Sequence, residues 1–475
     1  MFASQEQSTR VPLVIDLDHT LIQTDSFHEA LVRFCWEYPF QIWRLFGWAC
    51  KGKARMKHEV FTRVGLDFQV VPVHDVVVRL CEMAHQEGRD VVFATATPTI
   101  CLDSLVGRFS WITKVVGSTP QVNLVGHAKA SALVSLYGEG GFDFVSDHRR
   151  DLPVWHVCRK GWVLHSRLPS WAEPLGVVLI PTQRNQISAL IRLLRPKHWV
   201  KNLALIYPLL MAHCFFSWDS WRLIGLAVMA FSMVASAIYI LNDLADLEHD
   251  RQHREKKKRP MASGSVTLPV ALTLAVFLLG LGFSVGFGLS ASFGGALFLY
   301  VAIYILYQAR VKKMLILDIF MLTAFYEIRI FSGGFVSGVP LSNWLLAFSF
   351  FTFLTLGTLK RFAELQGQEY ANDSKLKGRD YEDKDKPVLL AFGAAYATAS
   401  IGVLGMYIES PNAYKLYTNV MPLWGIMAVY TAWIMYVWIK TNRGDFVEDP
   451  IALIYSDRFT LISAFVVILL FWMSI

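Results

Sequence analysis

The sequence is poor in cysteine and lacks any paired cysteine spacing. Its six cysteines are scattered over 475 residues, and none belongs to a CxxC or Cys/His pattern of the kind that binds zinc. Disulfide frameworks and cysteine-based zinc sites are therefore not expected, and a reduced, cytosolic setting fits best. The first residues also lack a basic stretch followed by an apolar run, so we expect no signal peptide.

Charged residues are also scarce, at 17% of the chain against 54% hydrophobic residues. The scarcity is uneven, because apolar runs after about residue 190 approach the roughly 20 residues that span a bilayer. A chain of this length exceeds one soluble core, and we expect two domains, at 1–188 and 189–475. The net charge of +7 then reflects basic loops on one side of a membrane, and no nucleic-acid partner is expected.

The first domain alternates between apolar strands and helical stretches. Residues 12–18, 91–95 and 142–147 are apolar runs that end in polar turns, and residues 75–87 and 127–137 have helical character. This alternation predicts a Rossmann-like α/β fold, with a parallel sheet covered by helices on both faces. Catalytic groups in such sheets gather at the carboxyl ends of the strands.

Residues 26–60 interrupt the alternation with an aromatic-rich stretch followed by a basic one. Two interpretations stay open. The segment is a small helical cap with its own core, or it is a cap that enters the lipid headgroup region. In the second case four basic residues would meet anionic lipid. They are Lys51, Lys53, Arg55 and Lys57.

The second domain is predicted to be an all-α bundle that crosses the membrane about nine times. Basic residues cluster in alternate loops, and the loops between them carry a single lysine. The positive-inside rule places the basic side and the first domain in the cytosol, so we expect a bacterial inner-membrane protein. Residues 193–199 predict an interfacial helix anchored by Trp199. The expected spans are 198–216, 221–241, 268–289, 293–309, 314–335, 342–358, 388–408, 420–439 and 458–475.

Polar residues follow each predicted strand of the first domain. Asp16 and Asp18 come directly after the first strand, where one carboxylate can attack phosphorus while the other transfers a proton. Thr95 ends the second strand and can hold a phosphate oxygen. Lys129 can neutralise phosphate charge. Asp147 and Asp151, which follow the third strand, can complete a Mg²⁺ site.

This order of motifs resembles the haloacid-dehalogenase superfamily of phosphohydrolases over roughly residues 10–165. The resemblance implies that Asp16 is the nucleophile and Asp18 the general acid/base. It also implies that Thr95 and Lys129 bind phosphate. Ser146 stands where the family usually has glycine. The Mg²⁺ ligands expected on this basis are Asp16, Asp18, Asp147 and Asp151.

A second acidic motif ends an apolar span. Asp243, Asp246 and Asp250 are spaced by three and four residues, so on a helix they share one face. Three like charges repel unless a cation bridges them, which predicts Mg²⁺ carrying a diphosphate. A solvated helix tip is the alternative. Glu248 lies off this face and is not expected to take part.

Charged residues also fall inside the fifth span. Asp318 and Arg329 are eleven residues apart and share a helix face, where they either line a cavity or form an ion pair between helices. Several basic residues lie at the cytosolic ends of spans and are either topology signals or phosphate contacts. They are Arg259, Lys312, Lys360 and Arg361.

The second domain resembles the UbiA family of membrane prenyltransferases over residues 190–475. Within the family the likeness is to polyprenyl-phosphate phosphoribosyltransferases, on residues 195–202, 307–318, 328–334 and 360–365. The resemblance implies a substrate site that includes Lys201, Asn202, Asn242 and Tyr307. The DxxxD motif of members that use aromatic substrates is not evident, because the acidic stretch 381–385 is spaced differently.

These resemblances imply a bifunctional enzyme with Mg²⁺ in both domains. It would transfer a phosphoribosyl group from phosphoribosyl diphosphate to a polyprenyl phosphate in the bilayer, and the first domain would dephosphorylate the product. Two alternatives are an aromatic prenyltransferase that uses a prenyl diphosphate, and a first domain that acts only as a lid or regulator. The sequence leaves open whether the chain forms a homo-oligomer.

Overall fold

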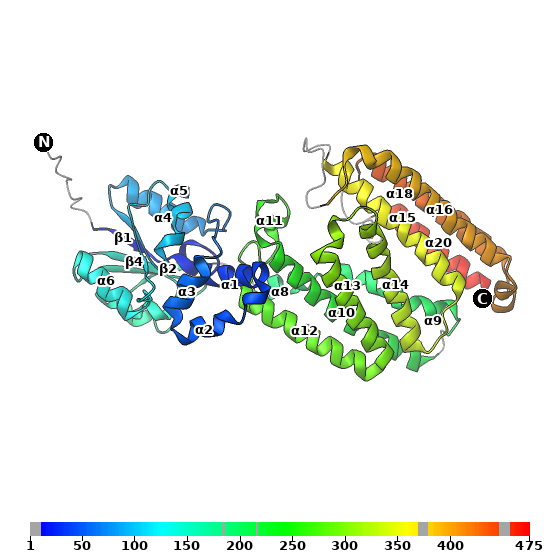
Figure 1. Ribbon diagram of the computed structural model, residues 1–475, viewed down its shortest axis with the longest axis horizontal. Helices are drawn as coiled ribbons and strands as arrows, with labels where there is room; N and C mark the ends of the chain where they lie inside the picture. Colours follow the sequence, from blue (N-terminus) through cyan, green and yellow to red (C-terminus); the bar gives the residue numbers. More distant parts are fainter. Residues whose placement is uncertain (1–10, 183–185, 215–216, 369–378, 446–456) are drawn as a thin grey trace. The chain divides into compact units, whose positions relative to one another are not determined.

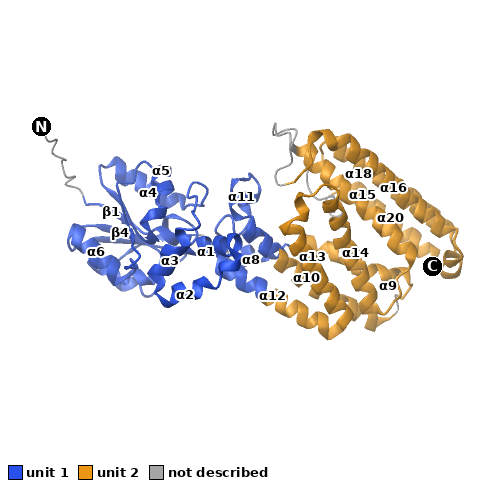
Figure 2. Cartoon of the chain, in the orientation of Figure 1, with its two compact units in different colours: residues 1–195, 239–276 blue, residues 196–238, 277–475 orange. Residues whose placement is uncertain are grey.

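The computed structural model divides into two compact units (Figures 1 and 2). The first unit joins Met1–Arg195 to Tyr239–Val276, and the second joins Pro196–Ile238 to Phe277–Ile475. The division into folding domains at residues 188 and 189 stays a prediction. The structure describes residues 11–182, 186–214, 217–368, 379–445 and 457–475.

A six-stranded parallel sheet forms the centre of the first unit, in the order β3-β2-β1-β4-β5-β6. β1 lies between β2 and β4, with Val14 opposite both Val92 and Phe144. Because the strands are parallel, their carboxyl ends meet at one edge of the sheet. The strands are β1 (Leu13–Ile15), β2 (Val91–Pro98), β3 (Lys114–Ser118), β4 (Asp143–Ser146), β5 (Lys160–His165) and β6 (Val178–Pro181).

Two apolar clusters cover the two faces of this sheet. Leu13 and Ile15 belong to one cluster and Val14 to the other, because successive side chains of a strand point to opposite faces. The first cluster packs α4 (Asp75–Gln86) and α5 (Asp103–Arg108). The second packs α6 (His127–Tyr137) and α7 (Leu152–Val157). The expected parallel sheet with helices on both faces is confirmed, as are the helices over 75–87 and 127–137.

The segment 26–60 is helical, as expected. It forms α1 (Ser26–Glu37), a 3₁₀ turn (Pro39–Gln41), α2 (Arg44–Cys50) and α3 (Lys53–Phe61). α1 buries Phe27, Ala30 and Phe34 in the first apolar cluster, whereas α2 buries none of its residues. Lys57 does not face lipid as the sequence suggested, because its buried ammonium donates to the carbonyl of Ala96 at 3.0 Å.

The second unit is helical, and seven helices of the described residues are long and apolar enough to cross a membrane. The ends of two of these apolar helices, α10 and α12, belong to the first unit. The seven are α10 (Trp218–Ala245), α12 (Leu268–Leu289), α13 (Ala291–Ala309), α14 (Leu317–Ser337), α15 (Asn343–Gln368), α16 (Lys386–Ile408) and α18 (Met421–Asn442).

The count of nine spans is not confirmed, and the expected span 198–216 is wrong. Its described residues form a 3₁₀ helix (Pro196–Ile206) followed by the short α9 (Tyr207–Met211), with proline in the first turn of each. The expected interfacial helix over 193–199 is also divided, because Arg195 has a φ of 53° after α8 (Gln186–Leu194). The last expected span is the shorter α20 (Arg458–Ser474).

Candidate functional site

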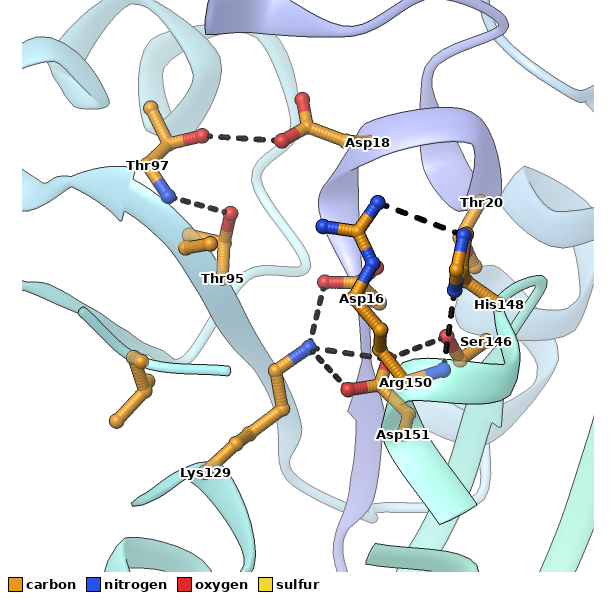
Figure 3. A network of polar contacts seen from close by, with 12 residues as sticks. Asp16, Asp18, Thr20, Thr95, Thr97, Lys129, Ser146, His148, Arg150 and Asp151 are labelled. Carbon is orange, nitrogen blue, oxygen red and sulfur yellow. Dashed lines mark hydrogen bonds and ion pairs between the residues drawn. The ribbon is translucent and has the colours of Figure 1, made fainter. Parts of the chain in front are cut away.

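The carboxyl ends of β1 and β4 bring three predicted site residues together. The ammonium of Lys129, on α6, lies 2.9 Å from Asp16 Oδ1 and 3.1 Å from Asp151 Oδ1 (Figure 3). All three side chains are largely buried. The Ser146 hydroxyl donates to Asp151 Oδ2 at 2.6 Å. We call this group the Asp16 site.

Asp18 lies in the turn after β1 and faces the start of α1. The backbone N–H of Ser26 donates to Asp18 Oδ1 at 2.8 Å, and the Thr97 hydroxyl donates to Asp18 Oδ2 at 3.5 Å (Figure 3). β2 continues past the expected end to Pro98, so Thr95 lies inside it. The buried Thr95 hydroxyl accepts the Thr97 N–H at 3.1 Å.

Burial perturbs both acids of the first motif. It raises the pKa of Asp16 to about 7, against the opposing charge of Lys129. Burial, and then the charge of Asp25, raises the pKa of Asp18. A carboxyl group that keeps its proton closer to neutral pH is suited to general acid catalysis. Perturbed groups of this kind concentrate at functional sites.

Asp147 lies at the edge of this group and not within it. It accepts a hydrogen bond from the Thr20 hydroxyl at 3.4 Å. A cavity of about 750 Å³ opens beside Asp147, which is within the usual size range of small-molecule sites. His19, His148 and His165 also line it.

The second acidic motif is held by arginines within the first unit. Arg259 donates to Asp250 Oδ2 at 2.6 Å and to Asp243 Oδ1 at 3.0 Å. Arg195 also donates to Asp243 Oδ1. The expectation that the three aspartates share one helix is wrong, because α10 ends at Ala245 and α11 (Leu247–Gln252) begins after Asp246.

The donor set at this segment fits a cation, although no metal cluster is assembled. In the part of the chain that the structure describes, no three His, Cys, Asp or Glu side chains lie close enough to hold a metal ion. Asp250 Oδ1, however, is buried without a hydrogen-bond partner. Buried polar atoms are normally paired, and carboxylate oxygens are the ligands that Mg²⁺ prefers.

A separate buried ionic cluster lies in the second unit around Asp318. Arg361 Nε lies 2.5 Å from Asp318 Oδ2, and neither side chain is exposed. The Tyr381 hydroxyl donates to Asp318 Oδ1 at 2.7 Å, and Arg379 lies 3.2 Å from Asp318 Oδ2. Tyr307 joins the cluster by accepting from Arg361 at 3.3 Å. The ionic partner of Asp318 is therefore not Arg329, as the shared face had suggested.

Arg329 lies farther along α14, in a separate polar and aromatic group. It donates to Asn202 Oδ1 at 2.9 Å and to the Tyr300 hydroxyl at 3.1 Å. Its guanidinium carbon lies 4.8 Å from the centre of the Phe231 ring. Asn202 in turn donates to Ser232 at 2.9 Å. The remaining predicted residues lie on helical segments, half-buried, and are Lys201, Asn242, Lys312 and Lys360.

Sequence reasoning missed several of these partners. Thr97 is two residues from Thr95 on the same strand, so the alternation of β2 could have indicated it. Arg195 is in a stretch that was recognised without a role. Tyr381 begins the acidic stretch 381–385 and Arg379 precedes it, but this stretch was compared only with the DxxxD motif. No local pattern indicated that the Asp18 carboxylate accepts the Ser26 N–H at the start of α1, because the contact depends on the fold.

A family model described as the UbiA prenyltransferase family matches residues 204–453. The chain is 28% identical to the uncharacterized protein y4nM of Sinorhizobium fredii over 458 residues. The aligned region covers 94% of this chain and 88% of y4nM. The likeness to y4nM therefore includes the sheet-containing residues as well as the helical ones.

Two further similarities concern part of the chain. The decaprenyl-phosphate phosphoribosyltransferase of Mycolicibacterium smegmatis is 34% identical over 187 residues, which are 38% of this chain and 59% of that protein. A UbiA homolog from Archaeoglobus fulgidus, solved bound to GPP and Mg²⁺, covers 60% of this chain and 97% of its own. It has 16% identity and a TM-score of 0.45.

Proposed function

The chain belongs to the UbiA prenyltransferase family, and from that premise we propose that it transfers a phosphoribosyl group from phosphoribosyl diphosphate to a polyprenyl phosphate. We also propose that the Asp16 site is a haloacid-dehalogenase-type phosphatase that acts on the lipid-linked product. One observation supports the transferase site above others. Asp243 and Asp250 both bind Arg259, while Asp250 Oδ1 has no hydrogen-bond partner.

In the proposed transfer, Asp243, Asp246 and Asp250 would hold Mg²⁺, which would stabilise negative charge on the leaving diphosphate. A phosphate oxygen of the lipid attacks the anomeric carbon of the ribose. The bond from that carbon to the diphosphate breaks, and diphosphate leaves with the electron pair. Arg259 and Arg195, which now neutralise Asp243, would turn toward the diphosphate oxygens.

The proposed phosphatase step uses the groups gathered at the sheet edge. The Asp16 carboxylate attacks the phosphorus of the ribose phosphate, and the Asp18 carboxyl protonates the departing sugar oxygen. Water then hydrolyses the aspartyl-phosphate. Lys129 offsets charge on the phosphoryl oxygens from its place beside Asp16. Asp147 and Asp151 would complete a Mg²⁺ site with Asp16, which adds charge neutralisation.

The second unit supplies positioning groups in this proposal. Arg361 is fully buried and bound by both Asp318 and Glu364, so we assign it to positioning and not to phosphate contact. Arg329 is assigned the same role within its aromatic group. Lys312 and Lys360 are the proposed phosphate contacts. The transferred group and the acceptor in this proposal are those in the name of one relative, decaprenyl-phosphate phosphoribosyltransferase.

A two-arm labelling assay tests the proposal. The purified chain in lipid receives radiolabelled phosphoribosyl diphosphate with polyprenyl phosphate, or a labelled prenyl diphosphate with an aromatic acceptor. We expect label to enter the lipid fraction in the first arm only, and only with Mg²⁺ present. Transfer in the second arm alone would support an aromatic prenyltransferase. The proposed location is a bacterial inner membrane, with residues 1–188 in the cytosol.

A further inference from the structure

Two buried side chains join the helical insertion to the second acidic motif. Arg251 of α11 donates from both terminal nitrogens to Glu29 of α1, at 2.8 Å and 2.6 Å. The side chains are only 2% and 4% exposed. Both residues belong to the first unit, although 222 positions separate them. Arg251 directly follows Asp250 in the sequence, so this contact fixes the backbone next to a proposed Mg²⁺ ligand.

Two other contacts hold the same segment against the start of the chain. Arg33, also on α1, lies 2.6 Å from Glu248 Oε1 at a half-exposed position. Gly264 has a φ of +71°, and a Cβ at this residue would lie 2.7 Å from Gln23 Cβ. Arg251 also donates to the carbonyl of Ala262 at 3.3 Å, which ties the two ends of the segment together. Residues 247–264 thus contact the region 23–33 at three positions, namely Gln23, Glu29 and Arg33.

α1 also contacts Asp18 and Thr97 through its first turn. The Ser26 N–H binds Asp18, and the Ser26 hydroxyl lies 2.7 Å from the Thr97 hydroxyl. Glu29 follows Ser26 by three residues, which is about one helical turn. One short helix therefore touches the general acid of the proposed phosphatase and the segment that carries the aspartates of the proposed transferase.

Stability alone is a poor explanation for the Glu29–Arg251 pair. Removing two charges from water is costly, and a buried ion pair is often no more stabilising than apolar residues of similar volume. What such a pair supplies is a defined orientation, because a guanidinium that binds a carboxylate through two parallel hydrogen bonds can turn very little. The segment that it orients, residues 247–262, contains both Asp250 and Arg259.

We propose that the predicted N-terminal domain, residues 1–188, has a second function, in which Glu29 acts as a positioning residue for the transferase. Through Arg251 it holds the segment 247–262 in the arrangement that binds the divalent cation and the diphosphate. This proposal rests on the proposed transferase function. Residues 1–188, which carry the phosphatase site, are therefore also required for transfer, even in a variant that lacks phosphatase activity.

The test compares Glu29→Gln with Glu37→Gln, in full-length chain in lipid nanodiscs and in an Asp16→Asn background. Glu37 is a matched control, because its carboxylate binds Arg33 within α1 at an exposed position. Hydrogen exchange of peptides over 247–262 reports the contact itself. Mn²⁺ binding and the Mg²⁺ concentration for half-maximal transfer report the site. Asp243→Asn identifies which bound Mn²⁺ belongs to the transferase.

We expect Glu29→Gln to speed exchange over 247–262 and to weaken Mn²⁺ and Mg²⁺ binding by roughly 10- to 100-fold, the usual effect of losing a residue that orients metal ligands. Transfer at saturating Mg²⁺ should fall much less, and Glu37→Gln should match the parent. Glu29→Asp and the exchanged pair Glu29→Arg with Arg251→Glu should recover part of the affinity. Recovery by the exchanged pair would show that the contact is pairwise.

Unchanged Mn²⁺ affinity in Glu29→Gln, with or without faster exchange, would overturn the positioning role and leave the pair as packing. Failure of the proposed function looks different, because the parent chain would then show no transfer. Mn²⁺ binding and exchange would in that case still decide whether Glu29 organises the aspartates.

Discussion

The ammonium of Lys129 lies 2.9 Å from Asp16 Oδ1, although the two residues are 113 positions apart. Both side chains are nearly inaccessible, and Lys129 also binds Asp151. One ammonium group thus contacts two carboxylates at the edge of the sheet. Such an arrangement needs its cation, because an uncompensated buried carboxylate is strongly unfavourable.

Replacing Lys129 with Met should keep the side-chain volume and remove the charge. We expect phosphatase activity on a small soluble phosphate to fall by roughly 10²- to 10³-fold, the typical loss for one group that stabilises transition-state charge. Lipid transfer should persist. Lys114→Met, at an exposed lysine of the same unit, is the control. Undiminished hydrolysis by the Lys129 variant would remove this residue from the mechanism.

Replacing Asp250 with Asn should impair transfer through the loss of a cation ligand. We expect roughly a 10²-fold loss or more at physiological Mg²⁺, since a charge-stabilising ion is lost. Partial recovery at high Mg²⁺ would support the assignment, and a Mg²⁺ titration measures it. Glu255→Gln changes an exposed carboxylate in the following loop and should have no effect. Full activity at limiting Mg²⁺ in the Asp250 variant would contradict the assignment.

Asp318→Asn should destabilise the second unit, because it leaves the fully buried Arg361 with one carboxylate partner, Glu364, in place of two. Breaking such a pair costs about 3–5 kcal/mol. The double variant Asp318→Asn with Arg361→Gln should recover much of this loss, as measured by thermal unfolding in detergent. If the single variant unfolds at the same temperature as the parent, the cluster does not contribute to stability.

The aromatic side chains of α2 and its flanks should contact lipid. Trp36, Trp43 and Phe46 are 61%, 68% and 76% exposed, so they are not the core of a cap. Exposed Lys51, Lys53 and Arg55 follow them in sequence, the pattern of an interfacial segment. Trp48 differs, because it packs against Phe34 and under Arg63. We therefore expect Trp48→Ser to disturb folding, and Trp43→Ser to leave it intact.

A spin label at Phe46→Cys measures this contact, in a full-length chain in proteoliposomes whose six native cysteines, including the exposed Cys50, are replaced by serine or alanine. Lipid contact predicts high accessibility to oxygen and low accessibility to a water-soluble nickel complex. High nickel accessibility would place the segment in water, and low accessibility to both reagents would place it against protein. Either result would contradict the prediction. Hydrolysis of a soluble phosphate confirms that the labelled chain is folded.

The central strands and most membrane helices were predictable, because their physical signal is local. β1 and the start of β2 are continuous apolar runs, as buried parallel strands are. β3 and β5 begin with lysine and contain glycine, so their signal was weak. The apolar run at 198–216 resembled a span, but Pro196 and Pro208 begin two separate short helices in it.

The two sites differed in how far sequence could describe them. Asp16, Lys129 and Asp151 could be grouped, because parallel topology brings strand ends together and places α6 beside them. The contacts of Arg195 with Asp243 and of Arg251 with Glu29 could not be predicted, since no periodicity links residues 48 and 222 positions apart. The inclusion of residues 239–276 in the first unit depends on these long-range contacts. The roles of all these residues remain predictions.

The mass of the lipid product tests the central claim most directly. The full-length chain and its Asp16→Asn variant receive phosphoribosyl diphosphate and polyprenyl phosphate of one chain length, with Mg²⁺. We predict that the variant accumulates a phosphoribosyl lipid, whereas the parent yields the same lipid lighter by one phosphate. Asp243→Asn should yield neither. Identical product masses from parent and variant would contradict sequential action, and no phosphoribosyl lipid from either would contradict the transfer itself.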